Sequence, residues 1–465
     1  MLLFLIATAC TSPKVDDTSS ASPPTTVPWT GGQTRTIEDV PSRRGWQARR
    51  GIVHLHSPWS HDACDGVPLP DGSPDVECLA DLRAALCETA MDFAYLTDHP
   101  AHAADQSYKA LFHTKDGDVP IRQSGTQVAS QLQCADAHSV LWMPGIEDTL
   151  MPVGLSRHAG HSSEESHEIY DSAHASAVQA MKDAGSIVLV AHTEGKDLDQ
   201  LSDMIDAGVQ GVEIFNLHAA FDPTKREEDL GLDGLGWLTQ ITPFSSPDGT
   251  GEPDLFFLAV LQAQDVSLER WDALSAGGPV IGVAGTDAHQ NVLPLEFRDG
   301  ERGDSYRRML RWFSNNLLID EAISDLRPEH TDEALAAGRA YVAFEILGTP
   351  AGFDFHLEAP DGTTYEMGAS SPPGALSLTC PTLSAHSPRG LQAPQIQAKI
   401  LKDGELWAQG CGRFETDGPG VYRAEVQILP KHLTDFLGEN PDTWLHFYPW
   451  VYSNPIRVTP ASEGA

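Results

Sequence analysis

The chain has no apolar run of the roughly 20 residues that cross a bilayer, so membrane-spanning helices are not expected. Basic residues are scarce: 30 Lys and Arg stand against 66 Asp and Glu, which gives a formal net charge of −36. This balance excludes broad binding to nucleic-acid backbones, which needs a basic surface. The length of 465 residues suffices for a large catalytic domain and a smaller second domain.

Residues 1–10, MLLFLIATAC, are similar to a bacterial lipoprotein signal in which Cys10 carries the lipid. They depart from it because no basic residue precedes the apolar run and position 7 is not Leu. A truncated ordinary signal peptide is the alternative. We expect an exported protein, anchored to the membrane at Cys10 as a periplasmic or cell-surface lipoprotein. Residues 11–45 open with Ser, Thr, Pro and Asp and are expected to form a disordered linker.

Cysteine motifs for metals or redox chemistry are absent, since no two of the seven cysteines form a CxxC pair. Six cysteines remain after Cys10, and an even number in an exported chain favours disulfide bonds. Cys380 and Cys411 are expected to pair because no other cysteine lies in that late region. The pairing of the four earlier cysteines stays open.

Short β-branched runs alternate with helical patterns from residue 51 to about 316. This alternation predicts a parallel sheet covered by helices, and at least six such units favour a barrel over an open sheet. The expected strands cover residues 51–57, 92–99, 140–147, 186–193, 211–216 and 279–289. The expected helices cover residues 77–90, 125–137, 171–184, 197–207, 267–276 and 304–316.

Two further regions differ in composition. Residues 222–253 are rich in Gly, Pro and Asp, and we expect an insertion that shapes a substrate pocket on the loop face. From residue 347 to residue 465, turn signals separate short alternating runs, which is typical of an antiparallel β-sandwich. The barrel domain is therefore assigned to residues 46–346.

Side chains that bind metals stand at the ends of the expected strands. His54 and His56 close the first strand, and their spacing of two places both side chains on one face. In a closed parallel barrel all such strand ends converge on one face. The mixture of nitrogen and oxygen ligands suits Zn, Mn or Fe. The later strand ends carry, in chain order, Asp98 with His99, Glu147, His192, Glu213 with Asn216 and His218, and Asp287 with His289.

The ordered set resembles the polymerase-and-histidinol-phosphatase (PHP) family over roughly residues 51–313. Five motifs occur in the family's order: HLHSPWSHD at 54–62, LTDH at 96–99, PGIE at 144–147, VLVAH at 188–192 and GTDAH at 285–289. The resemblance implies a distorted TIM-like (β/α)7 barrel that holds about two or three divalent metal ions and hydrolyses phosphate esters.

The resemblance also implies the ligands. They are His54, His56, Asp62, His99, Glu147, His158, His192, Asp287 and His289. His61 is the alternative ligand to Asp62, and His161 is the alternative ligand to His158.

Roles follow from the same ligand set. Glu147 is expected to bridge metals, Asp287 to orient the attacking water, and His192 or His218 to assist proton transfer. Arg157 and Arg226 follow strand ends and, with His218, are expected to meet the substrate.

We therefore expect a metal-dependent phosphoesterase that acts on a small phosphorylated substrate and binds no extended nucleic acid. An amidohydrolase-like enzyme for a non-phosphate substrate is an alternative. That superfamily usually has a lysine or carboxylate on strand four and a lone late aspartate, where this chain has His192 and an Asp-x-His motif. A non-catalytic surface lipoprotein with a binding β-domain is another alternative, which the near-complete ligand set disfavours.

The lipoprotein signal gives a direct prediction. Changing Cys10 to Ala should move the protein from the membrane fraction to the soluble fraction, because the lipid has no other attachment point. Fractionation with immunodetection checks this. A protein that stays soluble and without lipid when Cys10 is intact would show the anchor to be wrong.

Overall fold

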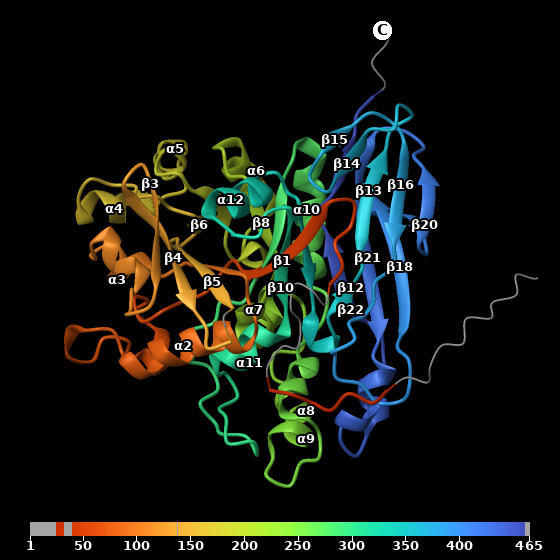
Figure 1. Ribbon diagram of the computed structural model, residues 1–465, viewed down its shortest axis with the longest axis horizontal. Coiled ribbons are helices and arrows are strands. Elements are labelled where there is room, and N and C mark those ends of the chain that lie inside the picture. The colour runs from red at the N-terminus through yellow and green to blue at the C-terminus, as the bar shows by residue number, and fades with distance from the viewer. Residues whose placement is uncertain (1–24, 32–39, 137, 461–465) are drawn as a thin grey trace, which may run out of the picture.

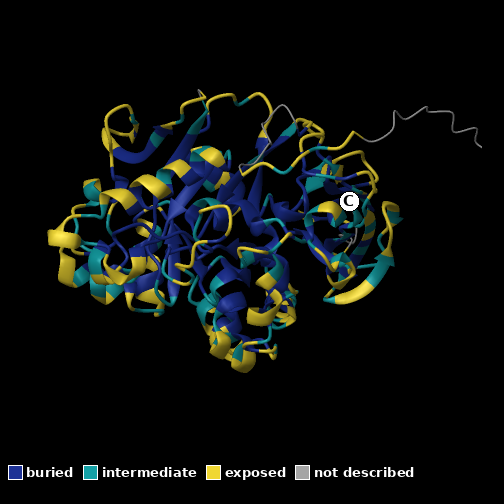
Figure 2. Cartoon of the chain, turned by 90° about the horizontal axis from the view of Figure 1, so that it is seen from below, coloured by how far each residue is buried: buried dark blue, intermediate teal, exposed yellow. Residues whose placement is uncertain are grey.

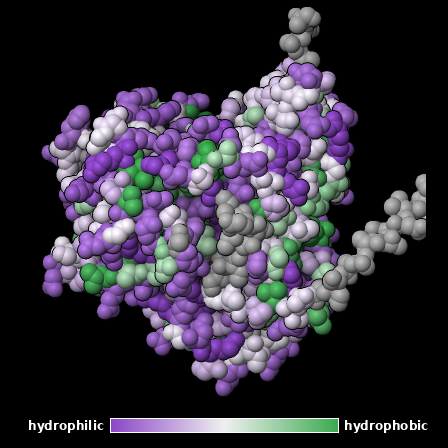
Figure 3. Space-filling view, viewed as in Figure 1, coloured by the Kyte–Doolittle hydropathy of each residue, from purple (hydrophilic) through white to green (hydrophobic). Residues whose placement is uncertain are grey.

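The computed structural model describes residues 25–31, 40–136 and 138–460. A mixed α/β part lies beside a β-rich part built from the C-terminal region (Figure 1). Among the described residues, no helix has both the length and the apolar character of a membrane span. The face drawn in Figure 3 is mostly hydrophilic with small, separate apolar patches, in keeping with the large net charge.

Seven short strands frame the α/β part and belong to two sheets. β1, β2 and β5 are parallel neighbours in one sheet; in the other, β7, β8 and β9 are parallel and β6 is antiparallel to β7. Isolated bridges, Gly145 with Val153 and Leu55 with Ala288, connect the two sheets. No continuous ladder of the described residues closes a barrel. The strands are β1 (Trp46–Ile52), β2 (Phe93–Leu96), β5 (Ser139–Pro144), β6 (Leu150–Val153), β7 (Ile187–Val190), β8 (Gly211–Asn216) and β9 (Ile281–Gly285).

The two faces of these strands bury different clusters, because successive side chains point to opposite sides. Phe93 and Tyr95 join an inner cluster with alternate residues of β5, β6, β7 and β9. Ala94 and Leu96 join an outer cluster that includes the apolar faces of the helices. Figure 2 shows buried strands beneath helices that are partly exposed.

The helices begin where the sequence provides caps. Asp75 accepts hydrogen bonds from the backbone of Glu77 and Cys78 at the start of α2, and a capping box with Asp197 starts α6. The expected helices over residues 77–90, 171–184, 197–207 and 267–276 are confirmed. The longer helices are α2 (Val76–Glu88), α4 (Ser163–Tyr170), α5 (Ala175–Asp183), α6 (Leu198–Asp206), α10 (Asp265–Gly277), α11 (Tyr306–Trp312) and α12 (Pro328–Ala336).

The expected helix over residues 125–137 is wrong. β3 (Val119–Gln123) and β4 (Thr126–Gln133) form an antiparallel hairpin instead. Ser124 and Gly125 join them with φ of 49° and 88°, the positive values that a two-residue hairpin turn requires. The helix expected to reach residue 316 also ends early, because β10 (Ser314–Asp320) pairs with β1.

The C-terminal region contains the antiparallel strands expected after residue 347. β11 (Ala340–Ala343) pairs with β10 on one side and with β22 (Tyr448–Ser453) on the other, so one large sheet runs from the α/β part into this region. A separate four-stranded sheet consists of β13, β14, β16 and β20. The remaining strands are β12 (Pro350–Ala351), β13 (Asp354–Glu358), β14 (Thr364–Glu366), β15 (Ser370–Ser371), β16 (Ala375–Thr379), β17 (Thr382–Leu383), β18 (Gln395–Lys402), β19 (Glu405–Gln409), β20 (Gly412–Glu415), β21 (Gly420–Leu429) and β23 (Ile456–Val458).

Part of the expected linker packs against the folded chain. Val27 forms a bridge with Arg389, and the Trp29 ring lies 5.6 Å from that of Phe436 and 4.4 Å from the guanidinium carbon of Arg311. Residues 25–31 therefore connect α11 with the C-terminal region. Cys10 lies outside the described residues, so the lipid anchor stays a prediction.

Three disulfide bonds use all six cysteines that follow Cys10. The predicted Cys380–Cys411 pair is confirmed. The two pairs left open by the sequence both involve α2. They are Cys64–Cys78 and Cys87–Cys134.

Asp254 stabilises the position of α11, the helix that follows the predicted metal-binding motif at residues 285–289. Its buried carboxylate accepts hydrogen bonds from Arg307 Nη2 at 2.6 Å, Arg308 Nη1 at 2.5 Å and Trp29 Nε1 at 3.1 Å. Burial alone would raise the pKa of Asp254, but the neighbouring arginines outweigh it and lower that pKa to about 2. The ionised carboxylate thus stabilises the fold around the end of the motif.

Asp254→Asn should lower the free energy of unfolding by about 2–3 kcal/mol at neutral pH. A carboxyl with a folded pKa of about 2 stabilises the fold above its unfolded pKa near 3.9 and loses that contribution as pH falls toward 2. Urea denaturation at pH 7 and pH 3 should therefore show a gap between variant and wild type that narrows in acid. Asp299→Asn, at a more exposed partner of Arg308, is the control with a smaller effect. A gap that stays constant with pH would contradict the assignment.

Candidate metal centre

The structure brings most of the predicted ligands together at the carboxyl ends of the strands. His54 and His56 follow β1, His99 follows β2, Glu147 follows β5 and Asp287 follows β9. These ends meet although the strands belong to two sheets, because the bridge between Leu55 and Ala288 joins the two segments that carry the His-x-His and Asp-x-His motifs.

The most buried part of the site is formed by His54, His56 and Asp287. The Nε2 atoms of the two histidines are 2.9 Å apart. Asp287 Oδ1 lies 3.3 Å from His54 Nε2 and 3.2 Å from His56 Nε2. Two imidazole nitrogens and one carboxylate oxygen therefore face a common point.

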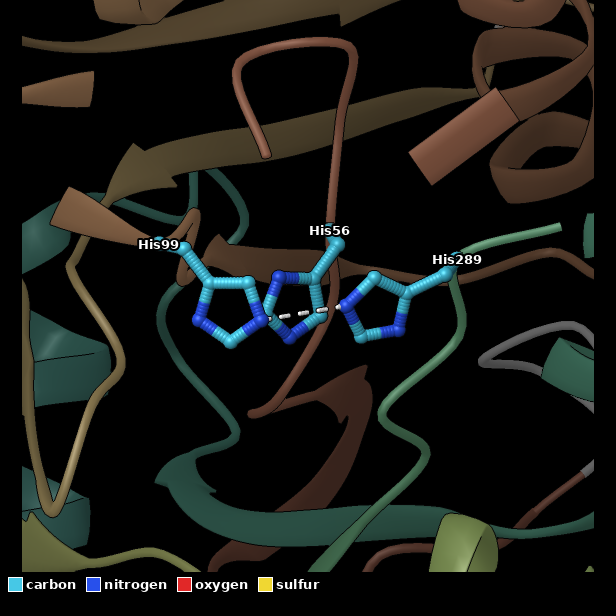
Figure 4. A group of neighbouring side chains, drawn as sticks. All are labelled: His56, His99 and His289. Atoms are coloured by element: carbon cyan, nitrogen blue, oxygen red, sulfur yellow. Dashed lines mark hydrogen bonds between the residues drawn. The ribbon is translucent and has the colours of Figure 1, made fainter. Parts of the chain in front are cut away.

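A second group adjoins it and consists of His99, His289, Glu147 and Asp62. His99 Nδ1 lies 2.8 Å from Glu147 Oε2, and His99 Nε2 lies 3.4 Å from His289 Nε2. Asp62 Oδ1 is 3.3 Å from His289 Nε2. The His56 ring stacks on that of His289 with ring centres 3.7 Å apart (Figure 4). Because His56 also contacts His54, it connects the two groups.

The side of the site that faces solvent carries His192, His218 and His61. His192 Nε2 and His218 Nδ1 each lie 3.4 Å from Asp287 Oδ2, and their side chains are 27% and 42% exposed. His61 is more exposed still and lies 3.9 Å from Asp62 Oδ1. A substrate would therefore approach over these three histidines.

The donor set fits divalent metal ions. His56, His99 and His289 form one group whose ligand atoms lie within 4.8 Å of one another, and His54, His56 and Glu147 form another. Within the described chain, each of the three acids in the predicted ligand set has one buried carboxylate oxygen that forms no regular hydrogen bond, although a histidine nitrogen lies within 3.4 Å of it. Buried carboxylates are costly unless a cation compensates them, and nitrogen with oxygen ligands suits Zn, Mn or Fe. The three oxygens are Asp62 Oδ1, Glu147 Oε2 and Asp287 Oδ2.

Neighbouring charges shift the two histidines of the first motif in opposite directions. Burial lowers the pKa of His54, but the carboxylates of Asp287 and Glu213 outweigh it and raise that pKa to about 9. Burial and the charge of His289 hold the pKa of His56 well below its usual range. A divalent cation binds the same lone pairs as these protons, so proton and metal compete at His54.

Two predicted ligands have a left-handed backbone. His192 has φ of 53° and Asp287 has φ of 49°. This conformation costs non-glycine residues about 1–3 kcal/mol and is found where the surrounding structure requires it. Hydrogen bonds fix both positions, from the His192 backbone to Glu213 Oε2 and from the Asp287 backbone to the His54 carbonyl oxygen.

Three predicted site residues lie elsewhere. His158 Nε2 donates to the Gln106 carbonyl oxygen at 3.0 Å and Nδ1 lies 3.3 Å from Tyr170 Oη, so both ring nitrogens have partners outside the cluster. Arg157 donates to the Asp183 carbonyl oxygen. The buried Arg226 guanidinium donates to the carbonyl oxygens of Ala220 and Asp233 and stabilises the loop after β8.

Three buried acids outside the predicted ligand set contact predicted ligands or their neighbours. The sequence placed Asp98 and Glu213 among the strand-end side chains that could bind metal, and it gave Glu194 no role. Glu213 Oε1 lies 2.6 Å from His54 Nδ1, and Glu194 Oε1 lies 3.2 Å from His192 Nδ1. Asp98 accepts from the Ser57 backbone and hydroxyl, and burial raises the pKa of Asp98 to about 6. The available signal was an acid inside the apolar strand GVEIFN, since a buried carboxylate needs a partner.

Comparisons with known proteins give no family assignment. No family model matches the chain, and no curated protein matches it. A Bacteroides vulgatus two-domain protein described as containing a predicted PHP-like metal-dependent phosphoesterase has a TM-score of 0.36 and 11% identity, over 89% of this chain and 97% of that chain. PsfC from Pseudomonas syringae has a TM-score of 0.35 and 11% identity, over 64% of this chain and 91% of that chain. TM-scores below 0.5 leave the residues themselves to carry the functional argument.

Gly285, at the end of β9, should not tolerate a side chain. A Cβ there would lie 1.9 Å from Glu213 Oε1 and 3.1 Å from His54 Nδ1. Gly285→Ala should displace the carboxylate, reduce the metal retained after dialysis and lower stability by about 1–3 kcal/mol. Gly277→Ala, at the end of α10 where a Cβ meets open space, is the matched control. Equal metal content and equal melting temperatures in the two variants would show that the contact is not essential.

Proposed function

We propose that the protein is a metal-dependent phosphoesterase of the PHP type, with about two or three divalent ions of Zn, Mn or Fe per chain. The carrying observation is the convergence of five side chains from three strand ends. They are His54, His56, Glu147, Asp287 and His289. The seven strands, with single bridges at the two junctions between sheets, support a distorted barrel, and the two C-terminal sheets support a β-sandwich.

Bound divalent cations would lower the pKa of water and stabilise charge on the phosphoryl oxygens. The protein's own residues would hold the ions, orient the attacking water and move protons. Glu147 contacts two histidines from different segments, with Oε2 2.8 Å from His99 Nδ1 and Oε1 3.6 Å from His192 Nε2, which suits a bridging ligand. Asp287 Oδ2 faces the solvent side and would accept a hydrogen bond from the attacking water. His218 Nδ1, 3.4 Å from that oxygen, would hold or move a proton, because His192 Nε2 is assigned to metal in the predicted ligand set.

Protein cations near the cluster have other partners. Lys196 Nζ donates to the carbonyl oxygens of Ala191 and His192, and Lys225 Nζ pairs with Asp229 at 3.1 Å. Arg270 donates to the backbone of the turn after His192. The charge of a substrate phosphate would therefore be met mainly by metal, with His218 as a partly exposed protein group at the opening.

The location of the protein is proposed from the same chain. Three disulfide bonds support an exported protein, because such bonds persist in oxidising compartments. We propose a lipid anchor on Cys10, upstream of the packed residues 25–31.

Hydrolysis of a phosphate ester should require bound metal and should be lost in Asp287→Asn, His54→Ala and Glu147→Gln. Asp287→Asn keeps the shape of the side chain but removes the anionic ligand, so the metal should bind more weakly and activity should fall by at least about 100-fold. Metal content, melting temperature and turnover of a panel of phosphomonoesters and phosphodiesters should be measured on the same samples.

His167→Ala removes a histidine that pairs with Asp105 away from the cluster, and serves as control. His158→Ala should also keep its metal, since the ring of His158 lies outside the cluster. Activity that survives exhaustive chelation, or full activity in Asp287→Asn, would rule the assignment out. Turnover of carboxylic esters or amides without phosphate esters would favour the amidohydrolase-like alternative.

A further inference from the structure

Glu213 is a fully buried acid within a strand. It lies on β8, whose six residues are all buried. The inner faces of β2, β5, β6, β7 and β9 carry apolar side chains, so a carboxylate on β8 is an exception that requires polar partners.

Both oxygens of Glu213 are used. Oε1 lies 2.6 Å from His54 Nδ1. Oε2 accepts hydrogen bonds from the His192 backbone N–H at 2.8 Å and from Asn216 Nδ2 at 3.0 Å. One side chain on β8 therefore contacts the ligand segment that follows β1 and the ligand segment that follows β7.

The contact with His54 decides which nitrogen can bind metal. An ionised carboxylate only accepts hydrogen bonds, so His54 Nδ1 must carry the proton and donate it. The lone pair of a neutral His54 then lies on Nε2, which points toward Asp287 Oδ1 and His56 Nε2. The contact also fixes the plane of the ring.

The contact with the His192 backbone supports a strained turn. His192 has a left-handed backbone, and its N–H bonds to Glu213 rather than to another peptide group. This bond holds the turn that points His192 Nε2 at Asp287 and Glu147.

His56 is oriented in a similar way by a different route. His56 Nδ1 lies 2.6 Å from Ser60 Oγ, which in turn donates to Asp98 Oδ1 at 3.2 Å. The serine hydroxyl uses its proton on Asp98, so it accepts the proton of His56 Nδ1. Both histidines of the motif thus present Nε2 to the same point. Each support also reaches a second ligand segment, since Ser60 Oγ accepts from the His99 backbone N–H at 3.0 Å and Glu213 accepts from that of His192.

We infer that Glu213 is a positioning residue of the metal centre, which orients His54 and the His192 turn so that both offer Nε2 to the same metal ions. This inference rests on the proposed metal site. Glu213 itself would not bind metal, since its two oxygens are engaged by His54, His192 and Asn216.

Glu213→Gln tests the inference with nearly the same shape. An amide has one accepting oxygen and one donating nitrogen, so it cannot satisfy both sides. With the nitrogen toward His54, the imidazole must carry its proton on Nε2, where it blocks metal. With the nitrogen toward the His192 N–H, two donors face each other and the turn should move.

Zn²⁺ affinity of the full chain should be measured by competition with a chromophoric chelator, and the absorption spectrum of the Co²⁺-loaded protein should report ligand geometry. We expect Glu213→Gln to weaken Zn²⁺ binding about 10- to 100-fold and to alter the Co²⁺ spectrum. Asp332→Asn is the control, because this half-buried carboxylate on α12 accepts from Tyr95 Oη at 2.6 Å, away from the cluster. It should leave both readouts unchanged.

The outcomes separate the two proposals. Wild-type protein that binds Zn²⁺ together with a Glu213→Gln variant of equal affinity and equal spectrum would overturn the positioning role and leave the proposed function standing. Wild-type protein that binds no Zn²⁺, Mn²⁺ or Fe²⁺ would overturn the proposed function itself. If Glu213→Gln does not fold, Glu213→Asp is the variant that tests the positioning role. It keeps the charge but withdraws the carboxylate by about 1.5 Å. A folded Glu213→Asp variant with weakened Zn²⁺ binding supports the inference; unchanged affinity, or loss of the fold in both variants, refutes it.

Discussion

The carboxylate of Asp287 is the contact on which the arrangement of the site depends. Oδ1 faces His54, His56 and His289, and Oδ2 faces His192 and His218, all within 3.4 Å. So many imidazoles around one buried carboxylate are stable only if protons or metal ions balance the charges. The backbone enforces the position: the Asp287 N–H bonds to the His54 carbonyl oxygen, next to the bridge that joins the two sheets. Asp287, the central carboxylate of the candidate metal centre, therefore lies at the junction of the two sheets.

Much of this site could be predicted from sequence because its ligands follow a simple geometric rule. Parallel strands place their carboxyl ends on one edge, so His54, Glu147 and Asp287 were expected to meet without any local metal motif. Arg226 and His158 show the limit of the rule. They also follow strands, but tertiary partners that have no sequence signal bind Arg226 to backbone carbonyls and the His158 ring to Gln106 and Tyr170.

Glu213 shows a different limit. Its strand is an apolar run with one acid. The sequence does not distinguish an acid that lies at the end of the strand from one whose side chain points into the interior. Only its partner His54, after β1, and the space left by Gly285 on β9 reveal its role, and both come from distant parts of the sequence. The hairpin of β3 and β4 was missed for a local reason, because the Ser-Gly turn signal was outweighed by a polar pattern that also fits a helix.

The C-terminal region supports the metal centre although every ligand candidate precedes it. Asn454, just after β22, hydrogen-bonds through its side chain to both the N–H and the carbonyl oxygen of Gly282 on β9 and to the carbonyl oxygen of Ala340 on β11. Gly282 is three residues before Gly285 and five before Asp287 on the same segment. Removing the region beyond residue 347 would leave β11 with an unpaired edge and leave those β9 groups without their partner. The β-rich part is thus expected to act on the chemistry through the position of β9 and its neighbouring strands, as a structural support rather than a source of ligands.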